Sequence, residues 1–460
     1  MDRGIGKVAK LTIGIDWGTH SSKWWYTLDG NSPRRAPNSV PRAIDSTVHR
    51  QGDTLVIQRE RVPVRSDVQD SRLKRLLLVD PMGADYWGAV RQGIGISLGE
   101  AATLVIACML SDAYASLSQT GANLDRVAIQ INYSLPNWTE ADPAHNVARQ
   151  RMFQTATVVS ALVDKTGWDT LPQLGTPVSI VDWRKRVQDS RRDIASLLSN
   201  CPPSFAKLMQ KEYQCGNISW RLAAESSAAG FLPLEYLLSD IPSESRAALH
   251  WVKLLVVDVG AGSTDSGYFV SSRRIEDQHL VFNYLPPALT LDYAGEQLTD
   301  MLRDHLRRTR RRDITQAEAE TLKLSAPEDW IDEPFVNEWR SKIARSVGEY
   351  IHSVPDKRRL PDILMPSLKI VLTGGSGVVR GLDSAIRSAV CEALIRRGIQ
   401  TAYANRTEVV ALRSPIPDRV DAARRAVSAG AAQPDFAQLA YVATFDEYVP
   451  HAVGPANPWV

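Results

Sequence analysis

Three short glycine-containing segments constrain this chain of 460 residues more than any other feature. They are residues 13–19 (IGIDWGT), 257–265 (VDVGAGSTD) and 371–377 (VLTGGSG). Each contains or follows a run of β-branched and aliphatic residues, which predicts a buried strand that ends in a tight turn. Glycine in such a turn accepts positive φ and lets backbone N–H groups approach an anion without an intervening Cβ. The three segments together predict loops that bind phosphate.

Two of the three strands end in an aspartate, Asp16 and Asp258. A carboxylate repels phosphate, so its expected partner is Mg²⁺ or the water shell around Mg²⁺. Any one of these segments alone is equally well explained as an ordinary connection between a strand and a turn. The three in this order favour a nucleotide site that contains magnesium.

With these loops the chain resembles the superfamily of actin, DnaK-type heat-shock chaperones and sugar kinases, whose loops DxGT, DxGxGTTD and GGxS occur in the same order. Four further segments resemble this superfamily. They are residues 225–229 (ESSAA, connecting helix), 292–296 (DYAGE, GGE element), 317–325 (AEAETLKLS, adenosine helix) and 426–432 (AVSAGAA, closing helix). Sugar kinases lack several of them. The nearest branches are therefore the nucleotide-binding domain of DnaK-type chaperones and the MreB-like bacterial actins.

The resemblance implies an α/β chain with the two-lobed actin-like ATPase fold, in which duplicated ribonuclease-H-like domains hold a nucleotide in the cleft between the lobes. The expected first lobe is 1–232, with an inserted subdomain at 36–97 and an extra insertion at 164–214. The expected second lobe is 233–432, with an inserted subdomain at 291–345, and 433–460 is a short C-terminal tail. No length remains for a chaperone's peptide-binding domain.

The resemblance also assigns site residues. Those expected to bind the phosphates are Gly18, Thr19, His20, Gly260, Gly262, Ser263 and Thr264. Asp16, Asp258 and Glu225 would hold Mg²⁺, mainly through water, Lys74 would reach the γ phosphate, and Asp265 would align the attacking water. The adenosine end would consist of Gly295, Glu296, Glu320, Lys323, Gly374, Gly375 and Ser376. Two assignments have ordinary alternatives: Lys74 as a surface lysine, and Glu320 with Lys323 as a helix ion pair.

The function implied is that of a chaperone-like ATPase or nucleotide-binding switch. It would bind Mg²⁺ and ATP or ADP, hydrolyse ATP slowly and control a protein partner, as a monomer or a nucleotide-dependent oligomer. Such chemistry depends on positioning and charge neutralisation. The alternatives are a filament-forming bacterial-actin-like ATPase and a nucleotide-binding scaffold without hydrolysis.

Several departures from the chaperone pattern weigh on hydrolysis more than on binding. His20 replaces a threonine, Val378 replaces an arginine, and Arg424 stands where an aspartate is expected. The second loop reads GAGST instead of GGGTF. After Pro136 the candidates for a catalytic carboxylate or amide are weak: Glu140, Asp142 and Asn146.

Composition excludes several other classes. The formal charge is +2 with both signs interspersed, so nucleic acid is not an expected partner. Four cysteines without CxxC spacing predict reduced thiols. No continuous apolar run reaches the roughly 18 residues of a membrane span, and the N-terminus leads directly into the first strand. A cytoplasmic protein without a membrane span is expected.

Two helical segments carry further expectations. The spacing of apolar residues from Leu98 to Leu117 predicts a helix with one apolar face. The insertion at 164–214 mixes tryptophan with arginine, including Trp168, Trp183 and Arg184. Such a mixture can mark a partner surface, but a solvated helix on the side of the lobe is the favoured interpretation.

Overall fold

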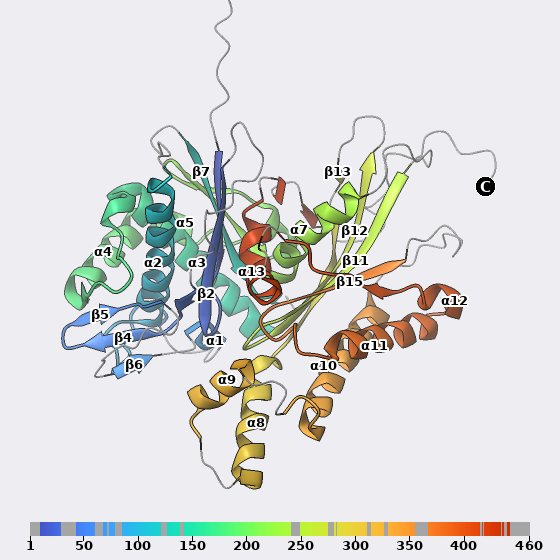
Figure 1. Cartoon of the computed structure of the whole chain (residues 1–460). Coiled ribbons are helices and arrows are strands. Elements are labelled where there is room, and N and C mark those ends of the chain that lie inside the picture. Colours follow the sequence, from blue (N-terminus) through green and yellow to red (C-terminus); the bar gives the residue numbers. More distant parts are fainter. Residues whose placement is uncertain are drawn as a thin grey trace, which may run out of the picture. The chain divides into compact units, whose positions relative to one another are not determined.

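The computed structural model describes residues 10–28, 43–59, 68–70, 73–78, 85–120, 127–138, 142–240, 249–274, 280–281, 283–310, 314–325, 330–354, 367–414, 416, 418–433, 435–436 and 439–441. The fold is mixed α/β, with three sheets and many helices (Figure 1). The chain divides into two compact units. Unit 1 is Met1–Phe231 with Val427–Ala437, and unit 2 is Leu232–Ala426 with Gln438–Val460.

The central sheet of unit 1 has the strand order β3-β2-β1-β7-β10-β9. Its strands are β1 (Lys10–Asp16), β2 (Ser21–Leu28), β3 (Ile44–Asp45), β7 (Ala128–Leu135), β9 (Tyr213–Cys215) and β10 (Ile218–Ala224). β1 pairs antiparallel with β2 and parallel with β7. The strand predicted before the first glycine loop is confirmed, and nearly every residue of β1 is buried because helices cover the sheet.

Helices α2 (Leu98–Ser118) and α3 (Pro143–Thr166) pack against each other and against this sheet. The helix predicted from Leu98 is confirmed, but the expectation of a single apolar face is wrong. α2 is buried around most of its circumference, including Glu100, because other elements of unit 1 cover it on several sides. Glu100 is satisfied there by a capping box, in which its carboxylate accepts a hydrogen bond from the Ser97 N–H at 2.7 Å.

A four-stranded sheet, also in unit 1, has the order β6-β4-β5-β8. Its strands are β4 (Val48–Gln51), β5 (Thr54–Val56), β6 (Val68–Asp70) and β8 (Val178–Ser179), and the short helix α1 (Leu73–Leu76) follows β6. The first three strands lie in the segment expected to form an inserted subdomain, whereas β8 comes from the extra insertion. The two segments are therefore joined by backbone pairing between β5 and β8.

The extra insertion contains the 3₁₀ helix η2 (Trp168–Thr170) and helices α4 (Ile180–Asp193), α5 (Ala195–Leu198) and α6 (Phe205–Gln210). Its two tryptophans both contact α2. Trp183 is fully buried and donates its indole N–H to the Glu100 carbonyl at 2.9 Å, and Trp168 stacks on Tyr114 of α2. Arg184 Nε lies 3.6 Å from Glu100 Oε1. These contacts favour a helix packed on unit 1 over a tryptophan-lined partner surface.

Unit 1 is completed by residues distant in sequence. Helices α7 (Glu225–Ser239) and α13 (Arg419–Ala431) each run across the boundary between the units. The end of α13 packs on β1 so closely that a Cβ on Gly14 would lie 2.1 Å from the Ser428 carbonyl oxygen. A Cβ on Gly430 would lie 1.8 Å from the Ala228 oxygen of α7. Both contacts require glycine.

Unit 2 is built on a seven-stranded sheet of order β16-β15-β11-β12-β14-β17, with β13 paired to β12. The strands are β11 (Leu249–Val259), β12 (Thr264–Arg274), β13 (Leu280–Val281), β14 (Asn283–Leu291), β15 (Leu368–Thr373), β16 (Glu408–Val409) and β17 (Ala440–Tyr441). Its helices are α8 (Gly295–Arg310), α9 (Gln316–Ser325), α10 (Pro334–Ser353), α11 (Leu382–Arg396) and α12 (Thr401–Ala404). β12 pairs antiparallel with β14, and α8 begins at Gly295.

The core of unit 2 joins the inner face of its sheet to α8, α10 and α11. Val257 of β11, Trp339 of α10 and Ile386 of α11 are all fully buried within it. The predicted tail begins inside the fold, since β17 pairs with β14, and residues 442–460 lie outside the described part.

One helix in the described part of the chain, α2, is long and apolar enough to cross a membrane. Most of it is buried inside unit 1, as in the core helix of many globular proteins.

The packing of α4 predicts unequal effects of two substitutions on one helix. Trp183→Ala should lower the free energy of unfolding by about 3–5 kcal/mol, because it leaves a cavity in a core. Val181, which is 74% exposed, is the matched control. Val181→Ala should change the free energy by less than about 0.5 kcal/mol. Urea unfolding followed by tryptophan fluorescence measures both, and equal small effects would contradict the packed arrangement.

Candidate functional site

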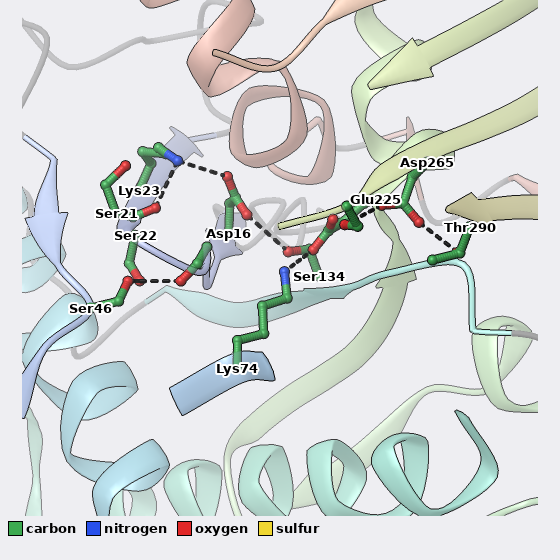
Figure 2. A network of polar contacts seen from close by, with 12 residues as sticks. Asp16, Ser21, Ser22, Lys23, Ser46, Lys74, Ser134, Glu225, Asp265 and Thr290 are labelled. Atoms are coloured by element: carbon green, nitrogen blue, oxygen red, sulfur yellow. Dashed lines mark hydrogen bonds and ion pairs between the residues drawn. The ribbon is translucent and has the colours of Figure 1, made fainter. Parts of the chain in front are cut away.

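The first glycine loop, residues 17–20, connects β1 to β2 in unit 1. Asp16 ends β1, is buried, and its two carboxylate oxygens have different neighbours (Figure 2). Oδ1 accepts a hydrogen bond from Ser134 Oγ at 3.5 Å, and Oδ2 lies 3.7 Å from Lys23 Nζ. Lys23 thus balances the charge of the aspartate that was expected to hold magnesium.

Ser46 holds the first loop from behind. Its hydroxyl donates to the Gly18 carbonyl at 2.8 Å, and its backbone N–H donates to the His20 carbonyl at 3.1 Å. In a trans peptide the C=O of one residue and the N–H of the next point in opposite directions. The Thr19 N–H is therefore directed away from Ser46, as a loop that binds an anion through its backbone requires.

Lys74 of α1 and Glu225, the first residue of α7, form a buried ion pair in unit 1 (Figure 2). Lys74 is only 6% exposed and Glu225 only 5%. The interpretation of Lys74 as a surface lysine is therefore wrong, because the approach of α7 encloses it. The structure brings together these two predicted residues, whose positions lie far apart in sequence.

The second glycine loop, residues 260–263, lies between β11 and β12 in unit 2. The first two N–H groups of α8 hold its carbonyls: Gly295 donates to the Gly260 oxygen at 3.1 Å, and Glu296 donates to the Ala261 oxygen at 2.7 Å. The N–H groups that follow these carbonyls, those of Ala261 and Gly262, must point away from α8. This arrangement repeats in unit 2 what Ser46 does in unit 1.

Gly295 is the point at which the predicted residues of unit 2 converge. A Cβ placed on it would lie 2.2 Å from Ser376 Oγ, 2.9 Å from the Gly260 oxygen and 3.4 Å from Lys323 Nζ. Three segments that are distant in sequence therefore meet at one residue without a side chain. A Cβ on Gly295 would collide with the first two of these atoms, so the close approach of the segments requires glycine.

Lys323 and Glu320 of α9 form an ion pair at 2.7 Å. The expected helix ion pair therefore exists, but it is not the only contact, because the buried Lys323 also donates to the Gly295 carbonyl at 3.0 Å and to Thr299 Oγ1 at 2.9 Å. The lysine charge is thus positioned beside Gly295, where the second and third loops meet. The geometry is compatible with an ordinary helix ion pair and with a pair that binds a ligand.

The third glycine loop follows β15 and is bonded to the end of β11. Asp258 Oδ1 accepts a hydrogen bond from Thr373 Oγ1 at 2.7 Å, and the Ser376 N–H donates to the Val259 carbonyl at 3.0 Å. Gly374 has φ +79°, and a Cβ on it would lie 2.3 Å from that same oxygen. Only glycine fits there.

Asp265 is completely buried in β12 and both of its oxygens accept hydrogen bonds (Figure 2). Ser263 Oγ donates to Oδ2 and Thr290 Oγ1 donates to Oδ1, each at 2.8 Å. Bonded in this way, Asp265 holds β12, β14 and the second loop together.

The structure describes two of the three weaker candidates after Pro136. Asp142 caps α3 by accepting a hydrogen bond from the Ala144 N–H, and Asn146 accepts one from Arg149. Glu140 lies outside the described residues.

No cluster of three or more His, Cys, Asp or Glu side chains with metal-ligand geometry occurs among the residues that the structure describes. Asp16, Asp258 and Glu225 were expected to act mainly through water, and the chemistry of their oxygens fits hydrated Mg²⁺.

The described cysteines, Cys108, Cys201, Cys215 and Cys391, are all free thiols. Burial raises the pKa of the Cys201 thiol to about 11, so it is protonated at neutral pH.

Sequence reasoning missed Lys23 and Ser46. A signal existed for Lys23, because SSKWWYTL places one cation in a strand that is otherwise neutral and largely apolar. No local pattern indicates Ser46, since its contact depends on how β3 returns to β2.

No protein-family model matches the chain, and no curated protein matches it significantly in sequence.

The buried ion pair of unit 1 predicts strong coupling between its two members. Lys74→Met should lower the free energy of unfolding by about 3–5 kcal/mol, because it leaves the Glu225 carboxylate buried without its cation. The double variant Lys74→Met with Glu225→Gln should cost clearly less than the sum of the single variants. Urea unfolding measures the cycle. Strictly additive effects would mean that the pair does not form in solution.

Proposed function

We propose that this chain is a nucleotide-binding switch with the actin-like two-lobed fold, closest in kind to a DnaK-type ATPase that lacks a substrate-binding domain. It would bind Mg²⁺-ATP, hydrolyse it slowly and so control a protein partner. The proposal combines the resemblance of the glycine loops with the local geometry of each unit. It takes the candidate residues of both units as ligands.

The observation that carries the proposal is the convergence at Gly295. Three loops and helices that the resemblance assigns to one ligand meet there around a residue without a side chain. The carbonyls of the second loop are bonded to α8, which turns the following N–H groups toward the other side. The buried Lys323 beside Gly295 supplies a charged hydrogen-bond donor for a phosphate oxygen or a ribose hydroxyl.

Each group of residues has a distinct task in the proposal. Backbone N–H groups of the two glycine loops would bind phosphate oxygens, while Asp16 and Asp258 would orient the water shell of Mg²⁺. Bound magnesium would neutralise phosphate charge. Lys323 and Glu320 would bind the sugar, and Gly374 would allow the third loop to pass close to β11.

Direct titration of Mg²⁺-ATP tests this proposal. Lys323→Met should weaken binding about tenfold or more, because it removes a buried charge-assisted donor. Lys185→Met is the matched control, since Lys185 is an exposed lysine of α4 in unit 1, and it should bind as the wild type does. Failure of the wild type to bind at millimolar ATP would refute the proposal.

A second candidate, a nucleotide-binding scaffold without hydrolysis, is favoured by one observation. Both oxygens of Asp265 are engaged by hydroxyl groups and the side chain is completely buried. A carboxylate held in this way is poorly placed to orient an attacking water.

Phosphate release separates the two candidates. If the chain is an ATPase, Asp16→Ala and Asp265→Ala should each lower release by at least about tenfold, as expected when charge positioning in a transition state is lost. Asp189→Ala, a surface substitution on α4, is the control and should leave release unchanged. Equal and minimal release by the wild type and both site variants would establish the scaffold.

A further inference from the structure

Ser46 lies behind the first glycine loop and belongs to none of the segments that resemble a known motif. It follows β3 and is buried, with 1% of its surface exposed. It contacts the loop at two points, the Gly18 carbonyl and the His20 carbonyl. It also bonds to the hydroxyl of Ser22, in β2 (Figure 2).

The direction of these bonds is determined by hydrogen counting. A serine hydroxyl has one hydrogen, and that of Ser46 is donated to the Gly18 oxygen at 2.8 Å. In the contact of 2.8 Å between the two serine hydroxyls, Ser22 must therefore be the donor and Ser46 the acceptor. Removal of the Ser22 hydroxyl would leave the bond from Ser46 to Gly18 in place.

Ser46 is itself held by regular structure and not by a loose connection. Asp45 before it pairs with Ser21, and the Asp45 N–H donates to the Gln58 carbonyl at 2.9 Å. The Thr47 N–H donates to Asp45 Oδ1 at 3.0 Å, which fixes the turn into β4. β4 is a central strand of the four-stranded sheet, so the serine has a rigid support.

The turn of the first glycine loop is tightly closed. A Cβ on Gly18 would lie 2.2 Å from the Ser21 carbonyl oxygen, so the turn is closed on itself. The Gly18 and His20 carbonyls face Ser46, and the intervening Thr19 N–H faces the opposite side. The orientation of the Thr19 N–H therefore depends on the hydrogen bond from the Ser46 hydroxyl to the Gly18 carbonyl.

We propose that Ser46 is a positioning residue of the first glycine loop: its hydroxyl fixes the Gly18 carbonyl, which turns the Thr19 N–H toward a bound phosphate group. The identity of the ligand in this inference rests on the proposed nucleotide function, whereas the effect of Ser46 on the loop does not. Ser46 acts through the loop backbone and does not touch the ligand.

Two measurements on Ser46→Ala, Ser22→Ala and Ser46→Thr test the inference. The first is amide hydrogen exchange of residues 17–23 in the nucleotide-free protein. Ser46→Ala should exchange there about fivefold faster, the factor for roughly one lost hydrogen bond. Ser22→Ala removes an equally buried hydroxyl and should change exchange less than about twofold, because the bond to Gly18 remains.

The second measurement is the Kd for Mg²⁺-ATP. Ser46→Ala should bind about fivefold more weakly, Ser22→Ala should bind like the wild type, and Ser46→Thr, which keeps the hydroxyl, should restore binding. If the alanine variant does not fold, Ser46→Cys takes its place. It fills the site but carries only a weak donor, so it should bind about fivefold more weakly than the wild type. Ser46→Ala loses two hydrogen bonds and Ser22→Ala one, so the urea midpoint of Ser46→Ala should be the lower of the two. A purely structural role would move only these midpoints and leave loop exchange and the Kd unchanged.

The outcomes separate this inference from the proposed function. If the wild type binds no ATP but Ser46→Ala accelerates loop exchange and Ser22→Ala does not, the proposed function fails and the positioning role of Ser46 stands. If Ser46→Ala exchanges and binds as the wild type does, or if Ser22→Ala has the same effect, the inference about Ser46 is overturned.

Discussion

Hydrogen bonds to the carbonyl oxygens of the two glycine loops are the constraint on which the candidate site depends. In unit 1 a serine hydroxyl holds the Gly18 carbonyl, and in unit 2 the first N–H groups of α8 hold those of Gly260 and Ala261. Because each peptide is planar, a carbonyl fixed on one side directs the next N–H to the other side. Glycine makes the turns possible, but residues outside the loops decide where the donors point.

The sequence predicted the local part of this arrangement well. The strands before the three glycine loops and the helix that begins at Leu98 follow from runs and spacing of apolar residues. These features depend on neighbours within a few residues. The residues that meet at Gly295 were expected only from the resemblance of their segments to known motifs, and not from periodicity.

Residues whose role depends on tertiary contacts were harder to predict. From the sequence, Lys74 could be a phosphate ligand or a surface lysine, and only the tertiary contact with Glu225 of α7 shows that it is buried. In the insertion, the pattern of tryptophan and arginine was ambiguous because a partner surface and a helix packed on its own unit have the same composition. Only the burial of Trp183 distinguishes the two.

The glycine contacts of α13 have a consequence for the way the protein is made. Gly14 of β1 packs against Ser428, and Gly430 packs against Ala228, so unit 1 includes a segment that begins at Val427. The ribosome synthesises all of Leu232–Ala426 before that segment emerges. Domains of nascent chains usually fold in order from the N-terminus. The side of β1 that faces α13 nevertheless stays uncovered until the segment from Val427 has been synthesised. A fragment that stops at Phe231 would keep that surface exposed permanently.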